Sequence, residues 1–87
     1  MTVVLKISAP SREVYEQIVA IVGEDTPPGC IVHTASEVDG EVRIVDVWES
    51  QQAIDAFFNA KLGPAFAEVG MAGDPPELTE PFRVERG

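Results

Sequence analysis

The chain contains very little cysteine and little positive charge. Cys30 is the single cysteine among 87 residues, so no disulfide can form within the chain. There are 6 basic side chains against 15 acidic ones, and the net charge of −9 repels phosphate backbones and anionic lipid surfaces. We therefore expect neither a nucleic acid nor a membrane as partner.

Long apolar runs are absent as well. No stretch approaches the roughly 20 residues that cross a bilayer. Residues 1–6 lack the basic start and the extended apolar region of a signal peptide. The expected location is the cytoplasm.

Metal and cofactor motifs are also missing. The chain has one histidine and one cysteine, and its carboxylates show no metal-binding spacing. Gly70-Met71-Ala72-Gly73 lacks the strand-then-helix context of a phosphate-binding loop. The sequence therefore predicts no metal and no cofactor.

The chain does have a large apolar share for its length. Hydrophobic residues make up 45% of what we take as a single domain, residues 1–87. A domain this small buries only about 60–65% of the surface that its unfolded chain exposes. Part of the apolar surface is therefore expected to be buried against a partner.

The first half of the chain predicts a strand, a helix and a hairpin. Residues 3–7 are β-branched and predict a strand, and Pro10 is expected in the first turn of a helix that ends at Gly23. Tyr15 flanks the apolar stripe of this helix, which consists of Val14, Ile18, Ile21 and Val22. Residues 30–38 and 41–49 predict two strands joined by a type I′ turn at Asp39-Gly40.

The second half predicts another helix and a last strand. Ser50 is expected to cap a helix whose apolar stripe consists of Ile54, Phe57, Phe58 and Leu62. Gly63-Pro64 predicts a break or kink, and residues 81–85 predict an edge strand. The order β-α-β-β-α-β is that of a ferredoxin-like α+β fold, a four-stranded antiparallel sheet with two helices on one face.

The two-residue hairpin turn determines which residues face each other across the two strands. It places Ile31 opposite Trp48 and His33 opposite Asp46, on one side of the sheet, and Cys30 on the other side. Both sides of the hairpin carry aliphatic residues, whereas a solvated face would alternate more cleanly with polar residues. We therefore expect a second copy of the chain to cover the face that has no helices, giving a homodimer.

The motif at residues 45–50, Val-Asp-Val-Trp-Glu-Ser, resembles that of the dimeric α/β-barrel superfamily. The phenylalanine-rich helix, Leu62-Gly63-Pro64 and the final Pro-Phe-Arg-Val segment extend the likeness to the antibiotic-biosynthesis-monooxygenase-like domains. The resemblance implies two sheets packed into a barrel, with a pocket between each sheet and its own helices. Members of this superfamily include cofactor-independent oxygenases of polycyclic aromatics and haem-degrading enzymes. The pocket tryptophan and haem-ligating histidine of the latter correspond to Phe57 and Ala67 here, which argues against haem degradation.

The pair of His33 and Asp46 is the sharpest candidate for chemistry. A carboxylate beside an imidazole holds one tautomer and raises its basicity, which suits proton abstraction from a phenol or enol. Trp48, together with Ile31, Phe57 and Phe58, is the candidate pocket lining. The alternatives are a structural His–Asp pair, a core role for the aromatic residues, and an inert buried thiol at Cys30.

Two functions remain open at this point. The first is a cofactor-independent, monooxygenase-like enzyme acting on a small aromatic or quinol-type molecule, with His33 as base, Asp46 as its orienting carboxylate and Trp48 as pocket wall. The second is a non-catalytic dimeric module that binds a small ligand or has a structural role. Fold likeness alone does not choose between them.

Overall fold

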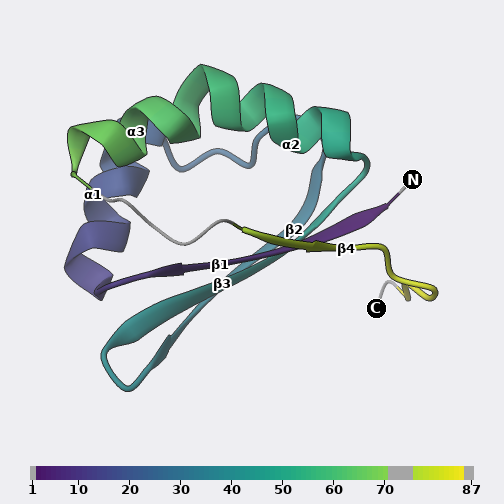
Figure 1. Cartoon of the computed structure of the whole chain (residues 1–87), viewed down its shortest axis with the longest axis horizontal. Helices are drawn as coiled ribbons and strands as arrows, with labels where there is room; N and C mark the ends of the chain where they lie inside the picture. Colours follow the sequence, from purple (N-terminus) through teal and green to yellow (C-terminus); the bar gives the residue numbers. More distant parts are fainter. Residues whose placement is uncertain (1, 71–75, 86–87) are drawn as a thin grey trace.

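The computed structural model describes residues 2–70 and 76–85, which form a sheet covered on one face by helices (Figure 1). The elements are, in order, β1 (Val3–Ala9), α1 (Arg12–Val22), β2 (Cys30–Val38), β3 (Glu41–Trp48), α2 (Gln51–Phe57), η1 (Phe58–Leu62), α3 (Gly63–Glu68) and β4 (Glu77–Thr79). The strand order is β2-β3-β1-β4, and every pair of neighbours is antiparallel. The predicted ferredoxin-like architecture is confirmed. No helix in the part of the chain that the structure describes is long and apolar enough to cross a membrane.

The hairpin of β2 and β3 turns as predicted. Asp39 and Gly40 both have positive φ, 52° and 84°, as a type I′ turn requires. The predicted register holds from Val38–Glu41 down to Val32–Val47, so His33 lies opposite Asp46.

The register shifts at the start of β2. An irregularity between Cys30 and Val32 puts Cys30, rather than Ile31, opposite Trp48. The predicted pairing of Ile31 with Trp48 was therefore wrong, as was the placement of Cys30 on the far face. Counting from a turn assumes an unbroken ladder, and an extra residue in one strand reverses the faces beyond it.

The helices α2 and α3 form one continuous curved run in Figure 1, joined by the π-helical segment η1. The backbone N–H of Gly63 donates to the carbonyl of Phe58, five residues earlier, and Pro64 then lies in the first turn of α3. The predicted break or kink at Gly63-Pro64 takes the form of a widened turn within a continuous helical run. Proline has no N–H to continue the regular ladder, and a wider turn ahead of it accommodates that loss.

Two further expectations need correction. The last strand is Glu77–Thr79, beside β1, and not residues 81–85; Phe82 lies there fully exposed. Pro81 cannot donate a ladder hydrogen bond, so the strand ends before it. Pro10 precedes the cap of α1 and does not lie in its first turn, because Ser11 is the N-cap and accepts from the N–H of Val14.

The core lies where β1, β3 and α2 meet. It consists of Val3, Leu5, Trp48 and Ile54, with Cys30, Ala53 and Phe57 packed against it. As predicted, Ser50 caps α2, since its hydroxyl accepts a hydrogen bond from Ala53 N at 3.2 Å. The start of α2 is thereby fixed directly after the strand that carries Trp48.

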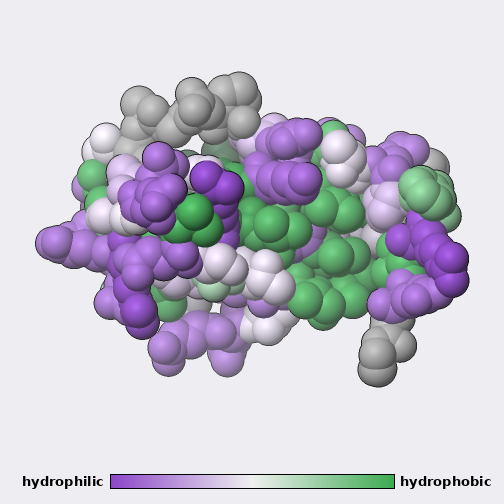
Figure 2. Space-filling view, turned by 90° about the horizontal axis from the view of Figure 1, so that it is seen from below, coloured by the Kyte–Doolittle hydropathy of each residue, from purple (hydrophilic) through white to green (hydrophobic). Residues whose placement is uncertain are grey.

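The face of the sheet without helices is markedly apolar. Seen from below in Figure 2, a broad hydrophobic area extends over the strands, with polar residues around it. Val32 and Val45, which belong to this face by the strand register, are 47% and 38% exposed. A single chain therefore leaves uncovered the surface that the sequence predicts to be buried in a dimer.

Candidate functional site

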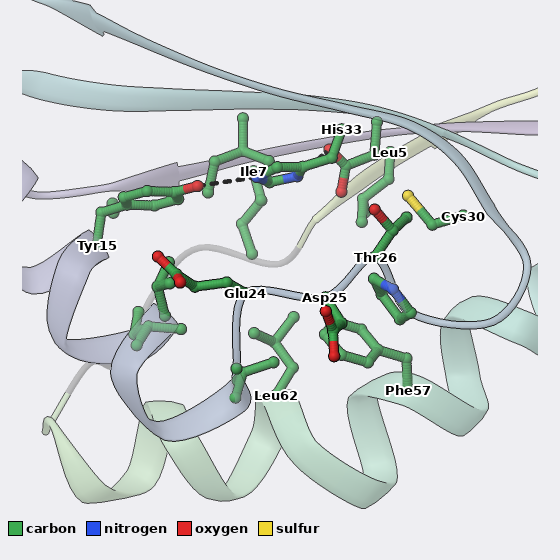
Figure 3. Close-up of a pocket in the computed structure, with 18 of the residues that line it drawn as sticks. Leu5, Ile7, Tyr15, Glu24, Asp25, Thr26, Cys30, His33, Phe57 and Leu62 are labelled. Carbon is green, nitrogen blue, oxygen red and sulfur yellow. Dashed lines mark hydrogen bonds and ion pairs between the residues drawn. The ribbon is translucent and has the colours of Figure 1, made fainter.

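A cavity of about 790 Å³ lies between the sheet and the helices. The sheet contributes apolar side chains together with Cys30, His33, Asp46 and Trp48, and the second helical run contributes Phe57, Leu62 and Phe66. The other wall comes from α1 and from the loop at residues 23–27 that follows it. Figure 3 shows Tyr15 and His33 on the sheet side of this space and Leu62 and Phe57 on the helix side.

Three polar side chains form a hydrogen-bonded chain along one wall of the cavity. Nδ1 of His33 lies 2.7 Å from Oδ1 of Asp46, and Nε2 of His33 lies 2.8 Å from the hydroxyl of Tyr15. The rings of Tyr15 and His33 are nearly parallel, with an interplanar angle of 7°. We call Tyr15, His33 and Asp46 the relay.

The tertiary structure brings the relay together from three elements. His33 and Asp46 are directly opposite residues of β2 and β3, and their side chains share the helix-covered face. Tyr15 comes from α1, and Figure 3 shows its hydroxyl pointing at the imidazole. The imidazole thus has a hydrogen-bond partner at each nitrogen.

The hydrogen-bonding capacity of the partners assigns the tautomer of His33. An ionised Asp46 can only accept, so Nδ1 carries the hydrogen and donates it to the carboxylate. The other nitrogen then has a free lone pair, which accepts the hydroxyl hydrogen of Tyr15. The relay is therefore poised to take up a proton at Nε2 through Tyr15.

Burial dominates the electrostatics of the relay. Asp46 is only 6% exposed, and its burial raises the pKa of the carboxyl above the ordinary value, while the adjacent imidazole partly offsets that rise. The pKa of Tyr15 is also raised, by burial first and then by the negative charges of Asp46 and Glu16. Tyr15 therefore remains a protonated phenol at neutral pH and serves as a donor to His33.

Two further residues with polar groups, Trp48 and Cys30, belong to the lining. Trp48 is 1% exposed, so its indole N–H is buried, and its interaction with Asp46 is one of the effects that lower the pKa of that carboxyl. Burial, followed by the charge of Asp46, raises the pKa of the Cys30 thiol to about 11. The thiol is therefore protonated at neutral pH and is no nucleophile.

The comparisons with known proteins identify the fold through structure alone. The sequence matches no family profile, and no curated protein is significantly similar to it. A proposed antibiotic biosynthesis monooxygenase from Chloroflexus aurantiacus is 18% identical with a TM-score of 0.72, and the match covers 99% of this chain and 98% of that one. The chain has the fold of the antibiotic-biosynthesis-monooxygenase-like domains. At this level of identity the likeness shows the fold and not the activity.

Other monooxygenase-like structures agree. A second proposed antibiotic biosynthesis monooxygenase, from Deinococcus radiodurans, is 16% identical with a TM-score of 0.66, and covers 99% of this chain and 97% of that one. SnoaB from Streptomyces nogalater, a cofactor-independent oxygenase, is 17% identical with a TM-score of 0.60, and covers 95% of this chain and 93% of that one. In both comparisons the match covers nearly the whole of each chain.

The structure separates the candidate site residues of this domain into two groups. His33, Asp46, Trp48 and Phe57 all line the cavity. Ile31 lies outside the lining, because the shift in β2 gives its place to Cys30. Phe58 also lies outside the lining and packs edge-on against Phe66, with ring centroids 5.9 Å apart. The aromatic wall therefore contains Phe66 where Phe58 was expected.

Tyr15 is the site residue that the sequence did not single out. It was placed at the flank of an apolar helical stripe, a position with no chemical signature. Its contact with His33 joins residues 18 apart in sequence and depends on how α1 docks on the sheet. No spacing rule within a single element predicts such a contact.

The part of the chain that the structure describes offers no group of three or more histidine, cysteine or acidic side chains that could hold a metal ion. The relay supplies hydrogen-bond donors and acceptors in the cavity, whose lining also includes the carboxylates of Glu16, Glu24 and Asp25.

Proposed function

We propose that this protein is a cofactor-independent oxygenase that deprotonates a small hydroxyaromatic molecule in its cavity and lets the resulting anion react with O2. The relay is the observation that supports this function. It joins a base with a defined lone pair to a phenol, at the wall of an otherwise largely apolar cavity. An apolar cavity with a few convergent polar groups is typical of a small-molecule site.

The proton moves through Tyr15. Because the Tyr15 hydroxyl already occupies Nε2 of His33, a substrate hydroxyl in the cavity donates to the oxygen of Tyr15. As the substrate loses its proton to Tyr15, the tyrosine passes its own proton to His33. The imidazolium that results lies beside the Asp46 carboxylate, which stabilises it.

The oxidation needs O2 as the one co-reactant. With anthrone as the example, loss of the enol proton leaves an anion whose charge is shared with the ring carbon. That carbon transfers one electron to O2, and the carbon radical and superoxide combine to a peroxide, which His33 reprotonates through Tyr15. Loss of the remaining C–H proton breaks the O–O bond, so that CH2 and O2 become C=O and H2O.

Phe57 forms the wall against which the substrate ring packs, and Trp48 supports it from the core. The two rings lie 5.5 Å apart at 34°. A packed aromatic pair of this kind holds the ring of Phe57 as an apolar surface for a planar ligand.

Oxygen uptake with anthrone and with hydroquinones tests the proposal, after subtraction of the rate without protein. We expect His33→Ala to lower uptake by about 100-fold, the usual contribution of a general base. Glu37→Ala, an exposed position on the same strand that does not line the cavity, is the matched control and should retain wild-type uptake. No uptake by the wild type, or equal uptake by His33→Ala, would show that the proposed chemistry is wrong.

Tyr15→Phe tests the route of the proton. It preserves the ring that stacks on His33 and removes the hydroxyl. We expect uptake to fall by about 10-fold or more, the lower range for the loss of a proton-transfer group. Unchanged uptake would mean that the substrate reaches His33 directly.

The alternative function, a non-catalytic ligand-binding module, predicts a different outcome of the same experiment. The largely apolar cavity suits a ligand equally well without any reaction. Quenching of the single tryptophan by a bound aromatic molecule, with no oxygen uptake, is the result that favours the alternative.

We also propose that the protein works as a homodimer through the helix-free face of its sheet. The exposed valines on that face support this, because a contiguous apolar surface on a small acidic chain favours association. A second copy matches this surface by two-fold symmetry.

A further inference from the structure

The geometry points to a ligand that carries a positive charge: a hydroxyaromatic amine rather than a neutral or anionic aromatic molecule. This inference concerns the same cavity as the proposed oxygenase function and rests on that function for the hydroxyl group. The charge preference itself rests on the lining of the cavity and concerns binding alone.

The titratable side chains of the lining are nearly all acidic. Glu16, Glu24, Asp25 and Asp46 line the cavity, and no lysine or arginine belongs to the lining in the described residues. His33 is the one basic group, and it is occupied at both nitrogens. An anionic substrate group would therefore meet carboxylates and no cation.

Two of these carboxylates already have a partner within the protein. Asp46 is hydrogen-bonded to His33, and Glu16 forms an ion pair with Arg12 at 3.3 Å. Their negative charges are thus partly balanced within the protein.

Glu24 and Asp25 have no such partner among the described residues. Among residues 2–70 and 76–85, neither makes an ion pair. They lie on the loop between α1 and β2. Figure 3 shows this loop, with Glu24, Asp25 and Thr26, between the sheet side and the helix side of the cavity. Both are exposed, so they form the rim.

The interior of the cavity complements a cationic aromatic molecule in a further way. The aromatic rings of Tyr15 and Phe57 line it, and ring faces attract cations. A hydroxyl at the relay and an ammonium group at the rim therefore satisfy opposite ends of the site.

Binding of three matched naphthols tests this inference. The compounds are 2-naphthol, 6-hydroxy-2-naphthoate and 6-(aminomethyl)-2-naphthol, which are neutral, anionic and cationic at neutral pH. Quenching of Trp48 fluorescence reports binding, because this is the single tryptophan and it lines the cavity. At low salt we expect the cation to bind roughly 10-fold more tightly than the neutral compound, and the anion more weakly still, with smaller differences at high salt.

Two double variants separate the rim from the charge of the whole protein. Glu24→Gln with Asp25→Asn removes the rim charges, and Glu13→Gln with Glu41→Gln removes two exposed charges that do not line the cavity. Both change the net charge equally. We expect the first to reduce the preference for the cation to less than about threefold and the second to leave it intact.

Three results would overturn the inference: equal or tighter binding of the anion, equal loss of preference in both double variants, or quenching by none of the compounds. Because binding is measured without any reaction, its outcome is independent of oxygen uptake. A charge preference without uptake would retain this inference and refute the oxygenase; uptake without a charge preference would do the reverse.

Discussion

At the scale of single residues, His33 owes its proposed role to two neighbours of different chemistry. Asp46 is buried and fixes the hydrogen on one nitrogen, while Tyr15 occupies the other nitrogen from a separate helix. The ionised carboxylate of Asp46 lowers the stability of the folded state, because burial raises its pKa. The same burial that strengthens its effect on the imidazole therefore opposes the stability of the fold.

Asp46→Asn separates these two effects. The amide oxygen still accepts from Nδ1, but the negative charge that would stabilise the imidazolium formed during the reaction is gone, so we expect oxygen uptake to fall by about 10-fold or more. Because the folded pKa of Asp46 is raised, its ionised form disfavours folding at neutral pH, and this penalty disappears as the pH falls through that pKa. The variant should therefore be at least as stable as the wild type at neutral pH, with any advantage shrinking in acid.

Denaturant unfolding at neutral pH and at about pH 4, the ordinary range for an aspartate, measures this difference. A variant that is clearly less stable than the wild type at neutral pH would show that the buried carboxylate stabilises the fold on balance.

Cys30 provides a chemical test of the cavity environment. Since burial raises the pKa of its thiol to about 11, we expect slow alkylation at neutral pH, with a rate that keeps rising up to about pH 11. A free cysteine peptide serves as the control and should level off near its ordinary pKa of about 8.5. A plateau at that ordinary value in the protein would contradict the partly buried placement of Cys30. Mass spectrometry after timed quenching gives the rates.

At the scale of elements, the site depends on how the chain enters β2. Gly29 has a φ of 89°, and a Cβ added there would lie 2.5 Å from Cβ of Ala53. Its carbonyl accepts from the N–H of Glu49 at 2.8 Å, next to the irregularity that turns Cys30 toward the cavity. The close approach of this loop to α2 is therefore possible only with glycine.

We expect Gly29→Ala to destabilise the protein by about 3 kcal/mol, since left-handed strain and overpacking each cost about 1–2 kcal/mol. Gly40→Ala is the matched control, because its φ of 84° is similar but nothing lies within 4 Å of an added Cβ. That control should lose only about 1–2 kcal/mol. Urea unfolding compares the two, and equal losses would show that the contact with Ala53 adds nothing.

At the scale of the whole molecule, the fold has one covered face and one bare face. Figure 1 shows the helices on the first face, and the cavity lies between them and the sheet. The exposed Val32 and Val45 lie on the second face. The relay and cavity are complete within one chain, so the proposed dimer contributes to stability rather than to the proton transfer.

The proposed dimer makes a direct prediction for solution mass. Sedimentation at micromolar concentration should report about twice 9.4 kDa. Val45→Lys places a charge on the bare face and should shift the mass toward the monomer. Ile21→Lys, which removes an exposed hydrophobic residue on α1 instead, is the control and should remain dimeric. A monomeric wild type would refute the proposed association.

Much of this architecture could be predicted from local sequence signals. The turn at Asp39-Gly40 and the strands on either side set the hairpin, and the strand register brought His33 opposite Asp46. As expected, Ser50 begins α2 and Gly23 ends α1, because capping depends on a few adjacent residues. Local signals failed where an irregularity intervened, at Ile31 and Cys30, and where a weak terminal strand was misplaced.

The sequence by itself determined the order of elements, the hairpin register and the negative charge, because each depends on neighbouring residues or on composition. Only the tertiary structure decided that Tyr15 completes the relay, that Cys30 and Phe66 rather than Ile31 and Phe58 line the cavity, and that Glu24 and Asp25 form its rim. These contacts join distant segments, and their geometry follows from how α1 and the second helical run dock on the sheet. Docking is set by side-chain packing across elements, which a linear pattern does not encode.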